Sequence, residues 1–95
     1  MNSEISKEKL DNYFSITKEA LDKVKDALDK ERLSEAEDFL DMAQRYYDDA
    51  GHFLNDKNDF VLAFAAINYA HGWLDAGARI GLFKVSDSRL FTVDG

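Results

Sequence analysis

Cysteine and proline are both absent from the chain, and each absence excludes something. Without cysteine there is no disulfide framework, no thiolate chemistry and no zinc site with cysteine ligands. Without proline, no helix is interrupted by a residue that lacks a backbone N–H. A run of lysine or arginine is also missing, and the net charge is −7. Because such a surface repels nucleic-acid phosphate and anionic lipid, we expect no nucleic-acid partner and no membrane partner.

The chain does have enough apolar residues for one hydrophobic core. It contains 95 residues, of which 45% are hydrophobic, and this length supports one domain rather than several. Residues 1–95 are therefore expected to form a single domain. Met1–Glu4 contain neither a basic region nor an apolar stretch, so we expect no secretory signal and a cytoplasmic protein.

Three segments have the periodicity of amphipathic helices, and the first covers about residues 6–29. Its apolar side chains recur at alternating spacings of four and three, which makes one narrow seam. The seam consists of Leu10, Phe14, Thr17, Leu21, Val24 and Leu28. Ser6 is expected to cap the first turn. A seam of this kind is typical of a helix that packs nearly antiparallel to its neighbours.

The second and third helices are predicted over about residues 34–55 and 59–80, after a break at residues 30–32. Ser34 and Glu37 match a capping box, in which the serine side chain accepts from a backbone amide and the glutamate returns the bond. Asp59 follows a polar turn and is expected to cap the third helix. Gly81 is then expected to end that helix in the left-handed conformation.

The third helix is apolar around most of its circumference, because only Asp75 and Arg79 are charged between its ends. Crossing a membrane takes about 20 apolar residues, and four polar residues interrupt this segment, so a buried core helix is the better interpretation. Two neighbouring helices do not cover this much apolar surface. A second subunit is the commonest supplier of the missing cover, and the tail of the same chain is the alternative.

The predicted fold is all-α: a three-helix antiparallel up-down-up bundle with an extended or β-prone C-terminal tail over residues 82–95. Residues 82–85 and 90–93 are two short β-prone runs. They form a small hairpin, lie extended across the bundle, or add to the edge of another chain. Because an isolated hairpin is marginal in water, we expect the tail to dock on something.

Asn68, His71, Asp75 and Arg79 are spaced by three, four and four, so they form one polar stripe on the third helix. One interpretation is a binding strip, in which the asparagine and histidine donate to a ligand or partner while Asp75 and Arg79 orient one another. The other is the solvated edge of the helix, with an exposed ion pair of little energetic value. We favour the edge and keep the four residues as the candidate binding site.

Two further constellations lie on the second helix. Arg45 and His52 resemble, in type and spacing, the Arg-x(4–6)-His motif of HEPN-type helical ribonucleases. The acidic surface around them disfavours RNA. Asp48, Asp49 and His52 form a cluster of potential metal ligands, but their number is too small for the di-iron sites that helical bundles hold. We therefore predict no catalytic residue, no metal and no cofactor.

The segment INYAHGWLDAG, residues 67–77, is the most distinctive part of the chain. The resemblance that it carries extends over residues 46–83 and includes Tyr47, Asp49-Ala50, Phe53-Leu54, Asp59 and Ala63-Phe64. This block resembles DUF357, a family of short archaeal proteins of unknown function. The resemblance implies a three-helix bundle, an archaeal cytoplasmic source and no known catalytic residues, and it brings no site with it.

The sequence therefore predicts a small non-enzymatic interaction module. It is expected to form a homodimer, or to bind another protein partner, through its apolar third helix and its tail. The alternative is a HEPN-like ribonuclease or a small-ligand-processing helical protein, using Arg45 and His52 or the polar stripe.

Overall fold

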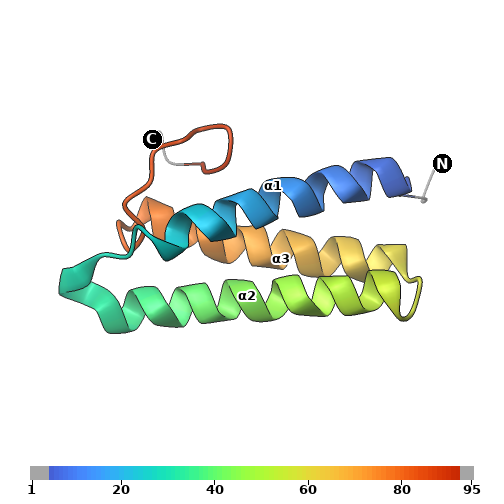
Figure 1. Ribbon diagram of the computed structural model, residues 1–95, viewed down its shortest axis with the longest axis horizontal. Coiled ribbons are helices and arrows are strands. Elements are labelled where there is room, and N and C mark those ends of the chain that lie inside the picture. The colour runs from blue at the N-terminus through green and yellow to red at the C-terminus, as the bar shows by residue number, and fades with distance from the viewer. Residues whose placement is uncertain (1–4, 93–95) are drawn as a thin grey trace.

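Three helices, each antiparallel to the next, make up the computed structural model, which describes residues 5–92 (Figure 1). Helix α1 spans Lys7–Lys25, α2 spans Leu33–Asn55 and α3 spans Phe60–Arg79, with a short 3₁₀ helix, η1, at Lys30–Arg32. The described residues contain no strand. The predicted all-α three-helix fold is confirmed. The predictions for Met1–Glu4 and for the last three residues of the tail lie outside the described residues.

Three of the predicted helix ends are confirmed by their capping bonds. The side chain of Ser6 accepts from the Lys9 amide at 3.1 Å at the start of α1. The side chain of Asp59 accepts from the Leu62 amide at 3.0 Å and begins α3. After α3, Gly81 adopts a φ of +80°, the left-handed conformation that glycine adopts without steric cost.

The end of α1 differs from the prediction, because the helix stops at Lys25 rather than near Asp29. Residues 27–29 pair with the tail instead of continuing the helix. Leu28 forms an isolated antiparallel bridge with Phe83, and the Asp29 amide donates to the Leu82 carbonyl at 2.8 Å. Backbone bonds to a segment more than fifty residues away therefore compete with the last turn of the helix.

The predicted capping box at Ser34 is wrong. The capping residue between α1 and α2 is Asp29. Its side chain accepts from the Glu31 amide at 3.0 Å and begins η1. That 3₁₀ turn runs directly into α2, so Ser34 already lies inside the helix, and the residue at the N-cap, Arg32, makes no side-chain capping bond.

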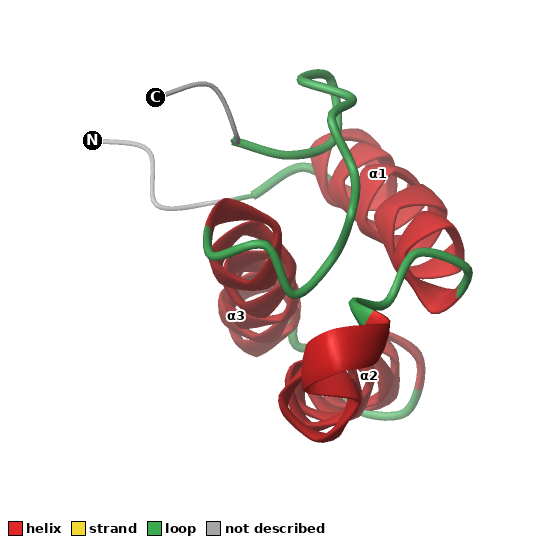
Figure 2. Cartoon of the chain, turned by 90° about the vertical axis from the view of Figure 1, so that its left-hand side faces the viewer, coloured by secondary structure: helices red, strands yellow, loops and turns green. Residues whose placement is uncertain are grey.

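Small side chains let α2 and α3 approach closely along their length. The buried side of α2 is a line of alanines spaced by seven residues, and α3 meets it with alanines of its own. These fully buried alanines are Ala36, Ala43 and Ala50 of α2 and Ala63 and Ala70 of α3. Backbones separated by alanines pack at the short end of the usual interhelical distance. Helix α1 covers one side of this pair, as the view along the bundle shows (Figure 2).

The tail after α3 turns back over α1 and docks on its own bundle (Figures 1 and 2). Its four large apolar side chains, Leu82, Phe83, Leu90 and Phe91, are each at most 2% exposed. Of the three arrangements open from the sequence, the described part of the tail lies across the bundle of its own chain. The tail therefore adds to the core rather than offering an apolar surface.

Candidate functional site

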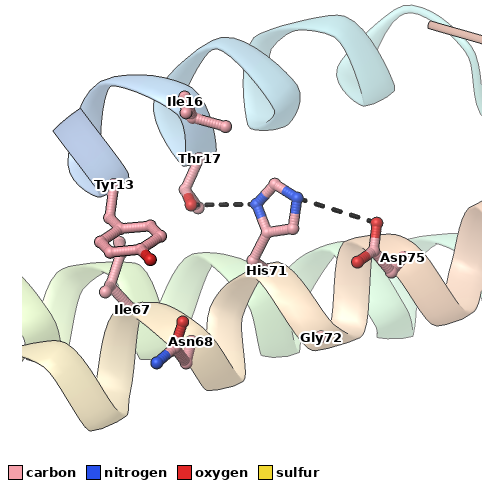
Figure 3. A pocket seen from close by; sticks show the side chains of 8 residues that line it. All are labelled: Tyr13, Ile16, Thr17, Ile67, Asn68, His71, Gly72 and Asp75. Carbon is pink, nitrogen blue, oxygen red and sulfur yellow. Dashed lines mark hydrogen bonds and ion pairs between the residues drawn. The ribbon is translucent and has the colours of Figure 1, made fainter. Parts of the chain in front are cut away.

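His71, at the centre of the predicted polar stripe, is bonded on both ring nitrogens, and Figure 3 shows its contacts with Thr17 and Asp75. Nδ1 lies 3.0 Å from the hydroxyl of Thr17 on α1, and Nε2 lies 2.7 Å from the backbone carbonyl of Leu90 in the tail. A carbonyl oxygen only accepts, so Nε2 must carry the proton. In the neutral ring Nδ1 then accepts from the Thr17 hydroxyl. His71 thus joins α1, α3 and the tail.

Asp75, one turn further along α3, holds the next residues of the tail. Its carboxylate accepts from the Thr92 amide at 3.0 Å and from the Thr92 hydroxyl at 3.4 Å. Asp75 Oδ1 also lies 3.7 Å from His71 Nε2. The expected pairing of Asp75 with Arg79 is not among the ion pairs of the described residues. The middle of the stripe therefore fastens the tail to α3.

Asn68 and Arg79, at the two ends of the stripe, are exposed. The structure thus divides the four predicted residues into two that hold the tail and two that face outward. A binding role for Asn68 and Arg79 stays a prediction. His71 and Asp75 were expected to bind a ligand or a partner, and in the structure they bind the tail of their own chain.

A third contact secures the turn of the tail on α1. The guanidinium of Arg89 donates to both carboxylate oxygens of Glu19, with one contact at 3.2 Å, and the Arg89 amide donates to Asp87 at 3.0 Å. The hydrogen bond from Arg89 lowers the pKa of the Glu19 carboxyl below its usual value. The tail is therefore bound at three successive places, to Glu19, His71 and Asp75.

This pKa shift predicts the effect of acid on the tail contact. A carboxyl whose pKa is lower in the folded chain contributes stability at neutral pH, and that contribution is lost as the pH falls below about 4 and through the folded pKa. We expect Glu19→Gln to lower the urea midpoint slightly at pH 7 and to leave it equal to the wild-type midpoint near pH 2.5. A difference between the two that is as large at pH 2.5 as at pH 7 would contradict this assignment.

A hollow of about 260 Å³ lies beside His71, between α1 and α3 (Figure 3). Its walls are Tyr13, Ile16, Thr17, Ile67, Asn68, His71, Gly72 and Asp75. Both ring nitrogens of His71 are bonded within the chain, so a ligand in the hollow would have to replace Thr17 or the Leu90 carbonyl to reach either of them.

Arg45 and His52 lie on one exposed face of α2, separated by about 10 Å along the helix axis. Each is paired with a carboxylate one turn away. Arg45 Nε lies 2.9 Å from Asp41, and His52 Nδ1 lies 2.7 Å from Asp56. A phosphate bound between them would have to displace both carboxylates, and the ribonuclease hypothesis gains no support from this arrangement.

The potential metal ligands of α2 do not converge. Asp48 accepts from the side chain of Gln44 at 3.0 Å, and His52 is turned toward Asp56. Within residues 5–92, no three histidine, aspartate or glutamate side chains are grouped as a metal site requires.

A different surface, the exposed side of α3, holds four of the five large hydrophobic side chains that are exposed in the described residues. We call it the α3 face, and it consists of Val61, Leu62, Ala65, Tyr69, Gly72, Ala76 and Ile80. Apart from the adjacent pair Val61 and Leu62, successive positions are three or four residues apart along the chain, so they share one side of the helix. The four large side chains on it are 46–63% exposed. None of the described helices is long and apolar enough to cross a membrane.

The centre of the α3 face is hollowed. Phe39, Tyr69, Gly72, Trp73 and Ala76 enclose an apolar depression of about 390 Å³. Aromatic contacts fix its walls: Phe39 meets Trp73 edge to face with ring centroids 4.9 Å apart, and Tyr69 stacks on Tyr46 at 5.3 Å. The sequence indicated an excess of apolar surface on this helix but not the depression, which depends on how α2 packs beside it.

These features define a small all-α protein of three antiparallel helices, with a tail fastened across α1 and α3. The chain belongs to the DUF357 family, because the family model described as a protein of unknown function (DUF357) matches residues 12–83. The predicted family membership is confirmed. Neither the search of curated proteins nor the search of solved structures found a match.

Proposed function

We propose that this chain is a non-enzymatic interaction module that self-associates through the α3 face. One observation carries the proposal: the α3 face, which has a charged residue only at its end, leaves Val61, Leu62, Tyr69 and Ile80 about half exposed in a chain of net charge −7. Contiguous exposed apolar surface on a small protein marks interaction sites. A homodimer is the commonest way in which such a surface is covered.

The alternative cover is the tail of the same chain, and its described part, residues 82–92, lies elsewhere. The tail is bonded to His71 and Asp75, which lie beside the α3 face rather than on it, and to Glu19 on α1. Its apolar side chains are buried against the bundle. The proposed interface therefore uses α3 and not the tail, a narrower surface than the sequence had suggested.

Of the alternatives, the ribonuclease and small-ligand hypotheses have weaker support. His52 and Arg45 are each paired with a carboxylate, and His71 has a partner on both nitrogens. The archaeal source and the cytoplasmic location that the family resemblance implied stay predictions.

The test is the molar mass in solution of two matched variants. Ala65→Glu places a charge in the centre of the α3 face, whereas Ser15→Glu places the same charge at an exposed position of α1. Because burying an unpaired carboxylate is costly, light scattering at high micromolar concentration should give the dimer mass for the wild type and Ser15→Glu, and the 10.8 kDa monomer mass for Ala65→Glu. A wild type that stays monomeric would overturn the proposal.

A further inference from the structure

The residues of the α3 face are arranged symmetrically about the middle of the helix. Large side chains occupy both ends, Val61 and Leu62 at one and Ile80 at the other, while alanine and glycine occupy the positions between them. Tyr69 is the one large side chain near the middle, and it stands one turn from Gly72. An interface between identical subunits related by a two-fold axis must match its own surface in this way.

We propose that two copies pack through α3 in antiparallel orientation, with each Tyr69 inserted into the depression of the other. A two-fold axis between positions 70 and 71 brings the large and small residues into register. Tyr69 then faces Gly72 of the second copy, Ala65 faces Ala76, and Val61 faces Ile80. This geometry rests on the self-association proposed above, and specifies which surfaces meet and in which direction.

The depression has the form that helix packing requires at this place. A side chain of one helix packs into a hole formed by four residues of the facing helix, at positions i, i+3, i+4 and i+7. Tyr69, Gly72, Trp73 and Ala76 have this spacing, and all four line the depression. Phe39 of α2 lines the depression as well. The small residues also allow the two backbones to approach closely.

Charge supports the antiparallel direction. Arg79 is exposed at the end of the α3 face, and the described ion pairs include none that it makes. An antiparallel arrangement places it beside the turn before α3 of the second copy, where Asp56 and Asp59 outnumber the single cation Lys57. A parallel arrangement instead brings the two Arg79 side chains together and sets glycine against glycine, which leaves the depression empty.

Disulfide cross-linking tests the direction, because the chain has no cysteine of its own. Ala65→Cys and Ala76→Cys are oxidised separately and then as an equimolar mixture of two differently tagged chains, with Ser15→Cys as the control. We expect a cross-linked heterodimer in the mixture. Neither variant alone should cross-link efficiently, because position 65 then lies about 16 Å along the axis from its symmetry mate.

The outcomes separate this geometry from self-association itself. Efficient cross-linking of Ala65→Cys alone would show a parallel pair and overturn the antiparallel geometry. A dimer that forms no cross-link in any sample would overturn it as well, since the α3 faces would not be in contact. A wild type that is monomeric by light scattering would instead overturn the self-association on which the geometry rests.

The inserted side chain is tested by its effect on the dimer dissociation constant. Truncation of an aromatic side chain at the centre of an interface commonly weakens binding about 30-fold or more, so Tyr69→Ala is expected to do so. Gly72→Gln, which fills the depression, should weaken association by at least 10-fold. The matched control is Gly51→Gln on α2, where an added side chain also meets open space. Equal dissociation constants for Gly72→Gln and Gly51→Gln would overturn the inserted geometry.

Discussion

The Gly77→Ala variant is expected to lose about 3 kcal/mol of unfolding free energy. Gly77 is buried in α3, and a Cβ added there would overlap the ring of Phe83. The Gly77 carbonyl also accepts from the Leu82 and Phe83 amides, at 2.8 and 3.3 Å, so the tail cannot move away from the helix at this point without losing those bonds. The methyl group therefore either displaces a buried phenylalanine or breaks the turn after α3.

Gly72→Ala is the matched control, since it makes the same change five residues earlier in the same helix. A Cβ at Gly72 meets nothing within 4 Å, so the higher helix propensity of alanine should stabilise the chain by about 1 kcal/mol. Urea denaturation measures both variants, at a concentration at which sedimentation shows the monomer mass for each. Opposite signs are predicted, and a Gly77→Ala chain as stable as Gly72→Ala would contradict the close packing of the tail.

His71→Ala is expected to cost about 2–3 kcal/mol, because it leaves two buried partners without a hydrogen bond. Thr17, 2% exposed, loses the acceptor for its hydroxyl, and the Leu90 carbonyl loses its donor. Hydrogen exchange should also show faster exchange of the Thr92 amide, which bonds to the neighbouring Asp75.

Asn68→Ala is the control for this prediction, since it alters the same stripe at an exposed position. Exposed substitutions of this kind change stability by less than about 0.5 kcal/mol. If the two variants were equally stable, the stripe would be the solvated edge that the sequence suggested, and His71 would not fasten the tail.

Local signals in the sequence predicted the parts of the fold that depend on neighbouring residues. Ser6, Asp59 and Gly81 were identified at helix ends because a cap depends on one turn of backbone. The end of α1 was predicted wrongly because residues 27–29 bond to the tail, and the capping box at Ser34 failed because Asp29 begins a 3₁₀ turn before it. Backbone bonds between residues so far apart along the chain produce no periodic pattern in the sequence.

The sequence predicted which residues of the candidate site share one side of α3, but not what they bind. Spacing alone placed His71 and Asp75 on one sector of α3, but the partners of both belong to a tail whose path no spacing reveals. One signal was available: Thr17 is the polar member of the otherwise apolar seam of α1. A buried hydroxyl requires a hydrogen-bond partner, and His71 of the facing helix is that partner.

The excess of apolar residues on α3 was also visible in the sequence, and the structure locates it on one face. One side of α3 is buried in the core that it shares with α1 and α2, and the described part of the tail lies beside the polar stripe. Val61, Leu62, Tyr69 and Ile80 stay exposed after these contacts are made. We therefore expect the chain to self-associate through this face.

Sedimentation equilibrium of the wild-type chain over a range of concentrations measures this self-association. We predict an average mass that rises with concentration from the chain mass of 10.8 kDa to twice that value and no further, since a two-fold interface closes on itself. A mass that stays at 10.8 kDa up to several hundred micromolar, or one that grows beyond the dimer without limit, would contradict it.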